Sequence, residues 1–331
     1  MVGQMGALAR LLEDEDVLQD VCTWYGCSGG AVSAWFAALG VSAAWIRDLA
    51  AVFDTRLLAG ISDGVVENFL EAWGLTDGSA MIGSAVRLAE TWEPGCGAWT
   101  FADLFREKGG VRLVVIATNV SEYRQAVFSV DTTPDMRIAD AIRASTAIPM
   151  FVSPWRDASG SYYCDGAVLE YYPWACVADK DDTLVVVCEE AGIPGRAWTP
   201  RPIGSMPEYL GRLASVLQHR AGHATPRNWI AVDTTFVSPI DFHMPRDTRL
   251  ALFEEGYGAA DRWLAFRASR TAAPASSESR RPSEDQNTLS SAHPSPESSS
   301  DTPECRSPPQ PPSPSRDSQY GPPRSGRRWT L

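Results

Sequence analysis

The amino-acid sequence predicts an α/β domain, because apolar runs of strand character alternate with helical segments. Two of the runs are nearly continuous stretches of β-branched residues, VRLVVIATNV at residues 111–120 and TLVVVCE at residues 183–189. Such runs are typical of strands that are buried on both faces of a sheet. The segment DMRIADAIRAST at residues 135–146 lies between them and has the apolar spacing of a helix.

The other elements extend this alternation along the chain. A helix is predicted over residues 6–18, where four leucines fall on one side and acidic residues follow. Short strands are predicted at residues 20–26, 125–132 and 227–234, and helices from residue 29, over most of 46–93 and around 248–266. The sequence contains no internal repeat. We therefore expect one layered α/β domain.

The composition changes sharply near residue 270. Residues 270–331 contain almost no aliphatic side chains and are rich in Ser and Pro. Such a segment cannot bury enough apolar surface to offset the entropy lost on ordering, so we predict a disordered tail. Its Ser-Pro steps and its PPQPPSP run are potential sites for tail-binding proteins. The predicted organisation is a folded domain at 1–269 and a tail at 270–331.

Charge and cysteine content exclude several classes of protein. The net charge of −12 argues against nucleic-acid binding, which normally needs a basic face. The 7 cysteines are odd in number and form no CxxC pair, which favours reduced thiols in the cytoplasm over disulfides or a zinc site. The first residues do not resemble a secretory signal, and the longest apolar stretch, 31–46, is better explained as a buried helix than as a transmembrane segment.

One serine has the setting of a nucleophile. The run Gly26-Cys27-Ser28-Gly29-Gly30 fits G-x-S-x-G, and it lies between a predicted strand and a predicted helix. This tight turn needs small residues around the serine, and the following helix directs N–H groups towards a developing negative charge. A glycine turn that only links a strand to a helix would give the same pattern, so the motif alone leaves both interpretations open.

A serine nucleophile needs a base that removes its proton. The sequence has four histidines, His219, His223, His243 and His293, and none lies in a recognisable motif. His219 and His223 have the i, i+4 spacing of metal ligands, but they lack the Glu of H-E-x-x-H. A histidine triad and a metal site are therefore weakly supported alternatives.

A carboxylate is the other option for the base. In YYCDGAVLEYYP, Asp165 follows a strand-like aromatic run and precedes Gly166 and Ala167. A carboxylate at a strand end beside small residues could approach a serine turn closely. An Asp-Gly pair taken alone is more often an ordinary turn.

Three segments in this order, GCSGG, RASTAIPMFVSP and CDGA…YYP, resemble the patatin-like phospholipase family. The similarity covers most of residues 5–265, including TFADLFREKGGVRLVVIATNV and VSPIDFHMPRDTRLALFEEGY. The resemblance implies a three-layer α/β/α sandwich with a central, mostly parallel sheet. It implies Ser28 as nucleophile and Asp165 as base, without histidine, metal or cofactor. The implied activity is hydrolysis of glycerolipid acyl esters, in the cytoplasm or peripherally at membranes.

The sequence departs from the family pattern at its start. The family normally opens with a strand and a glycine-rich loop that forms the oxyanion hole, and both would lie at or before Met1. Gly29 N–H is then the remaining, weak oxyanion donor. Three explanations stay open: a start codon upstream of Met1, a catalytically impaired protein that acts by binding lipid or a partner, or a different loop in the same role.

Overall fold

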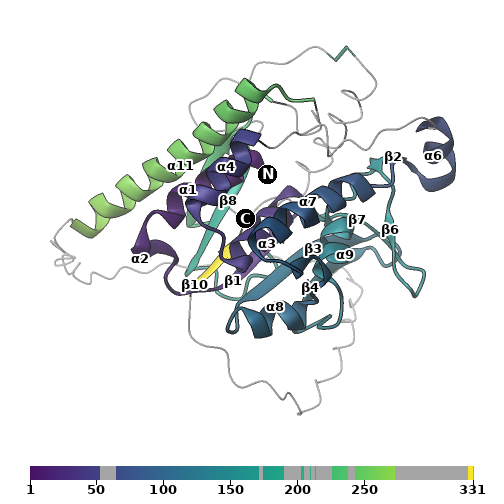
Figure 1. The fold of residues 1–331 in the computed structure, drawn as a ribbon, viewed down its shortest axis with the longest axis horizontal. Coiled ribbons are helices and arrows are strands. Elements are labelled where there is room, and N and C mark those ends of the chain that lie inside the picture. Colours follow the sequence, from purple (N-terminus) through teal and green to yellow (C-terminus); the bar gives the residue numbers. More distant parts are fainter. Residues whose placement is uncertain are drawn as a thin grey trace, which may run out of the picture. The chain divides into compact units, whose positions relative to one another are not determined.

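The computed structural model describes residues 1–52, 65–170, 174–189, 203–204, 209, 213, 226–237, 243–272 and 327–330. Figure 1 shows their arrangement. The helices are α1 (Val2–Leu12), α2 (Glu15–Leu18), α3 (Gly29–Leu39), α4 (Ala43–Val52), α6 (Val65–Ala72), α7 (Ser79–Trp92), η1 (Cys96–Ala98), α8 (Phe101–Glu107), α9 (Ile138–Ser145), η2 (Gly166–Val168) and α11 (Arg246–Ala272). The strands are β1 (Val21–Cys27), β2 (Gly74–Thr76), β3 (Arg112–Asn119), β4 (Arg124–Ser129), β5 (Met150–Val152), β6 (Trp155–Arg156), β7 (Tyr162–Asp165), β8 (Thr183–Glu189), β9 (Asn228–Asp233) and β10 (Arg327–Thr330).

The fold is α/β, as the sequence predicts, and its central sheet is mixed. The strand order is β6-β7-β3-β1-β10-β8-β9, with β4 also paired to β3. Strands β3, β1, β10, β8 and β9 run parallel to one another, whereas β4 and β7 run antiparallel to β3 and β6 runs antiparallel to β7. The expectation of a mostly parallel sheet therefore holds for one half of it, and the other half is antiparallel.

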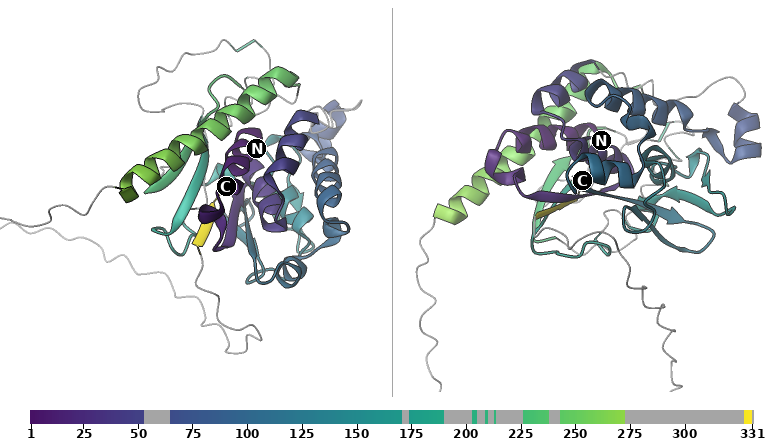
Figure 2. Two further views of the ribbon diagram at one scale, coloured as in Figure 1. Left: turned by 60° about the vertical axis from the view of Figure 1, so that its left-hand side comes forward. Right: turned by 60° about the horizontal axis from the view of Figure 1, so that its bottom comes forward.

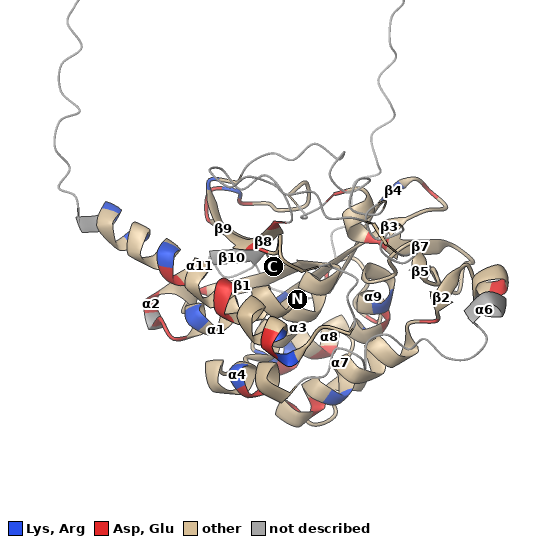
Figure 3. Ribbon diagram, turned by 90° about the horizontal axis from the view of Figure 1, so that it is seen from above, with Lys and Arg blue, Asp and Glu red and all other residues tan. Residues whose placement is uncertain are grey.

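Helices in the described ranges cover one face of the sheet (Figure 3). Alternate residues of the strands, such as Trp24, Leu113 and Val115, join helices α1, α3, α8 and α9 in the large core. α3 is apolar all round and nearly completely buried, as expected for a helix inside a core. The opposite face carries a small cluster built on Tyr25 and Ile116, which meets η2 and residues 174–177. The second helical layer of the expected sandwich is not found among the described residues.

The last strand corrects the prediction for the end of the chain. β10 lies between β1 and β8 and runs parallel to both (Figure 2), so four residues of the segment predicted to be disordered are part of the sheet. These four residues belong to the same compact unit as the described part of residues 1–268. The strand satisfies the edges of β1 and β8, whose N–H and C=O groups would otherwise need other partners. The rest of the predicted tail, residues 273–326, lies outside the described residues.

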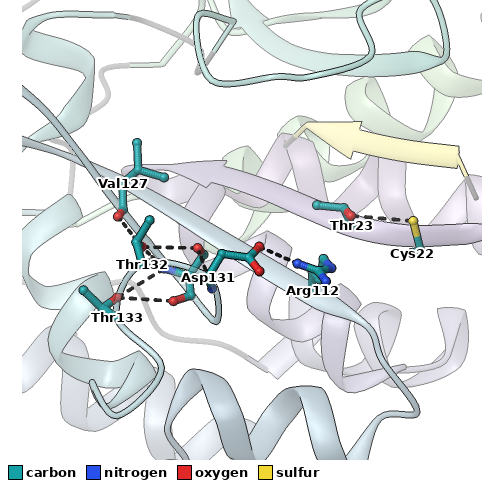
Figure 4. A network of polar contacts seen from close by, with 8 residues as sticks. Cys22, Thr23, Arg112, Val127, Asp131, Thr132 and Thr133 are labelled. Atoms are coloured by element: carbon teal, nitrogen blue, oxygen red, sulfur yellow. Dashed lines mark hydrogen bonds and ion pairs between the residues drawn. The ribbon is translucent and has the colours of Figure 1, made fainter. Parts of the chain in front are cut away.

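Polar contacts fix the turn that leaves β4 (Figure 4). The Thr132 hydroxyl donates to the Val127 carbonyl at 2.7 Å, and the backbone N–H of Ser129 donates to the Thr132 hydroxyl at 3.1 Å. Asp131 forms an ion pair with Arg112 at the start of β3. These contacts therefore hold together the start of β3 and the end of β4, at the end of the hairpin away from its connecting loop.

Candidate active site

Strands β1 and β7 meet end to end beside β3, and this meeting creates the site. Both strands lie on the side of β3 opposite to β4, because β4 pairs with the residues of β3 that β1 and β7 also contact. β1 runs parallel to β3 and ends with Cys27 opposite Ile116. β7 runs antiparallel and ends with Asp165 opposite Ala117. Ser28, which follows β1, and Asp165, which is the last residue of β7, are thereby brought together.

Ser28 occupies a strained turn between β1 and α3. Its φ of 55° and ψ of −129° are unusual for a residue with a side chain, and such strain is common at functional positions. Gly26 is required here, because a Cβ on it would lie 2.5 Å from the Cα of Ala31. The backbone N–H of Ser28 donates to Ser145 Oγ at 2.9 Å, and Ser145 Oγ donates to the Ile116 carbonyl at 2.5 Å. Ser145 therefore ties the turn to β3 and α9.

Asp165 is completely buried, and its Oδ2 accepts a hydrogen bond of 2.5 Å from the Ser28 hydroxyl. Its other oxygen, Oδ1, accepts from Ala167 N–H at 2.9 Å. Its backbone N–H donates to the Ala147 carbonyl at 2.9 Å, and its carbonyl accepts from the Thr118 hydroxyl at 2.9 Å. These contacts fix both the backbone and the side chain, so that Oδ2 faces the serine.

Burial raises the pKa of Asp165 from its ordinary 3.8 to about 6, although the hydrogen bonds from Ser28 and Ala167 lower it. Desolvation dominates because an ionised carboxylate loses its hydration in a buried site. A base with such a pKa is largely ionised at neutral pH and can still hold a proton during a reaction. The pair thus has the geometry and the proton affinity of a nucleophile with its base.

The neighbouring motif residues allow this close approach. A Cβ on Gly166 would lie 2.5 Å from the Ile116 carbonyl and 2.8 Å from Cys27 Sγ, so only glycine fits between the two strand ends. Burial, with added repulsion from Asp165, raises the pKa of the Cys27 thiol well above its usual range. Cys27 is therefore a neutral packing residue, whereas the hydroxyl next to it faces the carboxylate.

Gly29 and Gly30 begin α3 directly after the serine. The first N–H groups of an α-helix have no partners within the helix, so this end can face an anion. The start of α1 lies alongside, because a Cβ on Gly29 would be 3.2 Å from the Met1 nitrogen. The role of Gly29 N–H as an oxyanion donor stays a prediction.

The alternatives of a histidine triad and a metal site concern residues that do not join this pair in the described part of the chain. His219, His223 and His293 lie outside the described residues, and His243 lies in a turn before α11. The described ranges contain no cluster of three or more potential metal-ligating His, Cys, Asp or Glu side chains. No helix among these residues combines the length and the apolar character that crossing a bilayer would require.

Sequence reasoning missed the residues that support the pair. Ser145 and Ala147 belong to RASTAIPMFVSP, and Thr118 lies near the end of the central strand. The order of the motifs indicated that these segments matter, but nothing in their composition shows which atoms contact the serine or the aspartate. The signal available for Ser145 was its position within a segment shared with the family.

Comparison with known proteins points to one family. The profile described as Patatin-like phospholipase matches residues 2–175, which is more than half of the chain and includes both members of the pair. A curated protein of Invertebrate iridescent virus 6, "Probable lipid hydrolase 463L", is 35% identical over 74 residues, which cover 22% of this chain and 25% of the viral protein.

Two solved structures are also similar. VipD from Legionella pneumophila is 17% identical with a TM-score of 0.49, over 80% of this chain and 64% of VipD. ExoU from the type III secretion system of Pseudomonas aeruginosa, in complex with SpcU, is 19% identical with a TM-score of 0.37, over 80% of this chain and 49% of ExoU. The chain thus spans a quarter of the length of the viral relative and about half to two thirds of these two structures. By the profile match, this protein belongs to the patatin-like phospholipase family, a group of acyl hydrolases that act on lipids.

Proposed function

We propose that this chain is a calcium-independent serine acyl hydrolase of the phospholipase A or lysophospholipase type, which cleaves fatty-acyl esters of glycerolipids. The observation that carries the proposal is the hydrogen bond of 2.5 Å from the Ser28 hydroxyl to the buried Asp165 carboxylate. Membership of a family of lipid acyl hydrolases supports the choice of substrate. The site needs no metal in this scheme, because the acyl group is carried by the serine.

In the first half-reaction, Ser28 Oγ attacks the ester carbonyl carbon while its proton passes to Asp165 Oδ2. The bond to the leaving alcohol breaks, and the proton moves from Asp165 to the alcohol oxygen, which releases a lysolipid and leaves an acyl-serine. In the second half-reaction, water attacks the acyl carbon and gives a proton to Asp165. The fatty acid then leaves, and the proton returns to Ser28 Oγ.

The environment of Asp165 suits both directions of proton transfer. The Ala167 N–H holds Oδ1, so Oδ2 stays aligned with the serine throughout. A pKa of about 6 lies close to neutral pH, where a base both accepts and returns a proton efficiently. The N–H group of Gly29 at the start of α3 would stabilise the oxyanion.

The test is release of fatty acid from phosphatidylcholine in mixed micelles with EDTA present. We expect release by the parent chain, and its loss in Ser28→Ala and in Asp165→Asn. The matched controls are Ser159→Ala and Asp48→Asn, which change exposed residues of the same types and should keep activity.

Other outcomes would contradict the proposal. A folded parent chain that releases no fatty acid would favour the alternative of a catalytically impaired protein that acts by binding lipid or a partner. Activity that survives Asp165→Asn but is lost in His219→Ala, His223→Ala or His243→Ala would favour a histidine triad.

A further inference from the structure

Glu170 follows η2 and lies where several segments behind the serine–aspartate pair meet. Its carboxylate accepts two hydrogen bonds: Oε1 accepts from Ala175 N–H at 2.8 Å, and Oε2 accepts from Gln125 Nε2 at 2.6 Å. Gln125 belongs to β4, whereas Ala175 lies in the segment 174–177 that packs with η2 in the small cluster. One carboxylate thus joins β4 to the segment that follows η2. We call these two hydrogen bonds the Glu170 bridge.

The backbone of Glu170 contacts residues on either side of the reacting atoms. Its N–H donates to the Gly166 carbonyl at 3.2 Å, which extends the turn that η2 begins. Its carbonyl accepts a weak contact from the Cys27 thiol at 3.9 Å. Gly166 directly follows Asp165, and Cys27 directly precedes Ser28. A displacement of Glu170 would therefore be transmitted to the neighbours of both the base and the nucleophile.

The helix η2 matters to the pair through one hydrogen bond. The Ala167 N–H donates to Asp165 Oδ1 at 2.9 Å, while Oδ2 faces the Ser28 hydroxyl. η2 has only three residues, and a single 3₁₀ turn is not stable by itself. The position of the Ala167 N–H therefore depends on the contacts at the two ends of this turn.

The β3–β4 hairpin supplies a contact at each of these ends. Before η2, the Thr118 hydroxyl of β3 donates to the Asp165 carbonyl at 2.9 Å. After η2, Gln125 of β4 donates to the Glu170 carboxylate. Gln125 and Thr118 lie directly opposite each other in the antiparallel register of the hairpin. Two facing residues of one hairpin thus hold the segment that runs from the base to Glu170.

Hydrogen bonds and burial together set the proton affinity of Asp165. The Cys27 and Cys164 thiols lie near its charge, but burial raises the pKa of Cys164 to about 12 and that of Cys27 well above its usual range. Both thiols are therefore neutral at neutral pH. Burial raises the pKa of Asp165 to about 6, and the hydrogen bonds from Ser28 and Ala167 lower it. Loss of the Ala167 hydrogen bond would raise this pKa further.

Glu170 acts on η2 through hydrogen bonds and forms no ion pair within the described part of the chain. The titratable groups that face it are the Cys27 and Cys176 thiols, and its charge adds to the burial that raises the pKa of each. Lys180 lies near Cys176 and partly opposes this effect there. The partners of the carboxylate itself are an amide side chain and a backbone N–H, both neutral.

From these contacts we infer that Glu170 is a positioning residue for the base: the Glu170 bridge holds η2 against the β3–β4 hairpin and so keeps the Ala167 N–H on Asp165 Oδ1. The inference rests on the proposed function, in which Asp165 takes the Ser28 proton. Without the bridge, Oδ1 would lose its donor and Oδ2 would no longer be fixed towards the serine.

The first test measures kcat and KM for the soluble ester p-nitrophenyl butyrate as a function of pH. In Glu170→Ala, the pH at which kcat/KM reaches half of its plateau should rise from about 6 to about 7, because a hydrogen bond to a charged group changes a pKa by about one or more. The plateau of kcat should fall about tenfold, since a displaced base transfers the proton less efficiently. KM should change less than about twofold, because the bridge acts on the base and not on the substrate.

Three further variants separate position from charge. Glu170→Gln removes the charge and can keep both hydrogen bonds, once the Gln125 amide turns over to present its oxygen. It should match the parent chain. Gln125→Glu sets two carboxylates against each other and should imitate Glu170→Ala, also where the alanine variant does not fold. The double variant Gln125→Glu/Glu170→Gln exchanges donor and acceptor and should restore the parent profile.

The matched control is Glu254→Ala, the same substitution at an exposed glutamate of α11, which should keep the parent pH profile. A Glu170→Ala protein with the midpoint of the parent profile would overturn the inference. So would a Glu170→Gln protein that behaves like Glu170→Ala, or a double variant no better than Gln125→Glu. A general loss of folded protein lowers kcat without moving the midpoint, so it does not imitate the expected result.

A second test does not depend on turnover. Urea titrations compare the unfolding free energy of the parent chain and of Glu170→Ala with that of the same protein carrying Asp165→Asn. Since burial raises the folded-state pKa of Asp165, the stabilisation by its neutral carboxyl is lost as the pH rises through that pKa. The loss should be complete above about pH 6 in the parent chain and above about pH 7 in Glu170→Ala.

The two tests distinguish failure of the inference from failure of the proposed function. An inactive parent chain that shows this difference in the unfolding titrations would refute the proposed hydrolase and retain the Glu170 bridge. An active parent chain whose Asp165 titrates at the same pH with and without Glu170 would refute the bridge alone.

Discussion

Replacing Asp165 by Asn should stabilise the folded chain while it abolishes turnover. The amide keeps the shape of the carboxyl group and can keep both of its contacts, with its oxygen accepting from Ala167 N–H and its NH₂ group donating to the Ser28 hydroxyl. What it removes is the buried negative charge. Turnover is lost because an amide cannot take the serine proton, and this role is typically worth about 10²- to 10⁴-fold in rate.

The stability change follows from the pKa of the carboxyl. It is raised from 3.8 to about 6 by burial, so ionisation of Asp165 weakens the folded state by about 3 kcal/mol. Since the folded-state value is the higher one, the neutral carboxyl stabilises the fold at low pH. That contribution is lost as the pH rises from 3.8 through about 6. The Asn side chain stays neutral over this whole pH range, so the variant keeps that stabilising contribution.

Urea unfolding of both proteins across this pH range measures the effect. The advantage of Asp165→Asn in unfolding free energy should be small at about pH 4 and should grow by about 2–3 kcal/mol towards about pH 8. In parallel, kcat/KM of the parent chain should rise with pH and level off above about 6.

The exposed carboxylate of Asp48 gives the control, because Asp48→Asn should change stability by less than about 0.5 kcal/mol at any of these pH values. An advantage of Asp165→Asn that does not vary with pH would refute the reasoning. So would a variant that is less stable than the parent near neutral pH.

Three further substitutions or truncations test the architecture. Gly26→Ala should prevent correct packing of the serine turn and lower the unfolding free energy by several kcal/mol in urea titrations, because its Cβ would lie 2.5 Å from backbone. At Gly83, within α7, a Cβ would meet only the end of the flexible Arg87 side chain, at 3.2 Å, so Gly83→Ala should instead raise the unfolding free energy by up to about 1 kcal/mol. Ser145→Ala removes the acceptor of the Ser28 N–H and should cost about 1–3 kcal/mol in unfolding free energy and lower kcat, measured on a soluble ester. Deletion of residues 325–331 removes β10 and should lower the unfolding free energy by on the order of 2–4 kcal/mol, whereas deletion of residues 281–300 should not.

Each of these expectations has a contrary outcome. A fully active and stable Gly26→Ala protein would mean that the turn is looser than its contacts indicate. Unchanged kcat in Ser145→Ala would show that its hydrogen bond does not position the nucleophile. Equal stability after the two deletions would show that β10 does not complete the sheet in solution.

The buried strands of the fold were predictable because their composition is distinctive. β3 and β8 are nearly continuous apolar runs rich in β-branched residues, and this pattern is typical of strands that are buried on both faces. β10 was not predictable, since RRWT lies in a polar, Pro-rich stretch. One of the strands that it pairs with, β1, also lies about three hundred residues earlier in the sequence. The pairing of β2 with β5 was missed for a similar reason: each strand has three residues, and the contact depends on the close approach at Gly74.

The candidate site was predictable in its residues and not in its geometry. The small residues around Ser28 and the Asp165-Gly166 step gave both members of the pair, with the family resemblance needed to choose between an ordinary turn and a base. Their contact arises because β1 and β7 end at adjacent residues of β3, which is a property of strand register and not of local sequence. The positive φ angles of Trp73 and Tyr123 could not be predicted from the sequence, since aromatic residues rarely adopt this conformation.

Covalent labelling of Ser28 tests the central claim most directly. A fluorophosphonate forms an Oγ–P bond and expels fluoride only at a serine whose proton is removed by a nearby base, so it reports activation of the nucleophile independently of lipid preference. Intact-mass and peptide analysis should show one adduct, on Ser28, in the parent chain. The adduct should be absent in Ser28→Ala and strongly reduced in Asp165→Asn, while Asp48→Asn labels as the parent does. A folded parent chain that is not labelled at Ser28, or labelling that is unchanged in Asp165→Asn, would contradict the account.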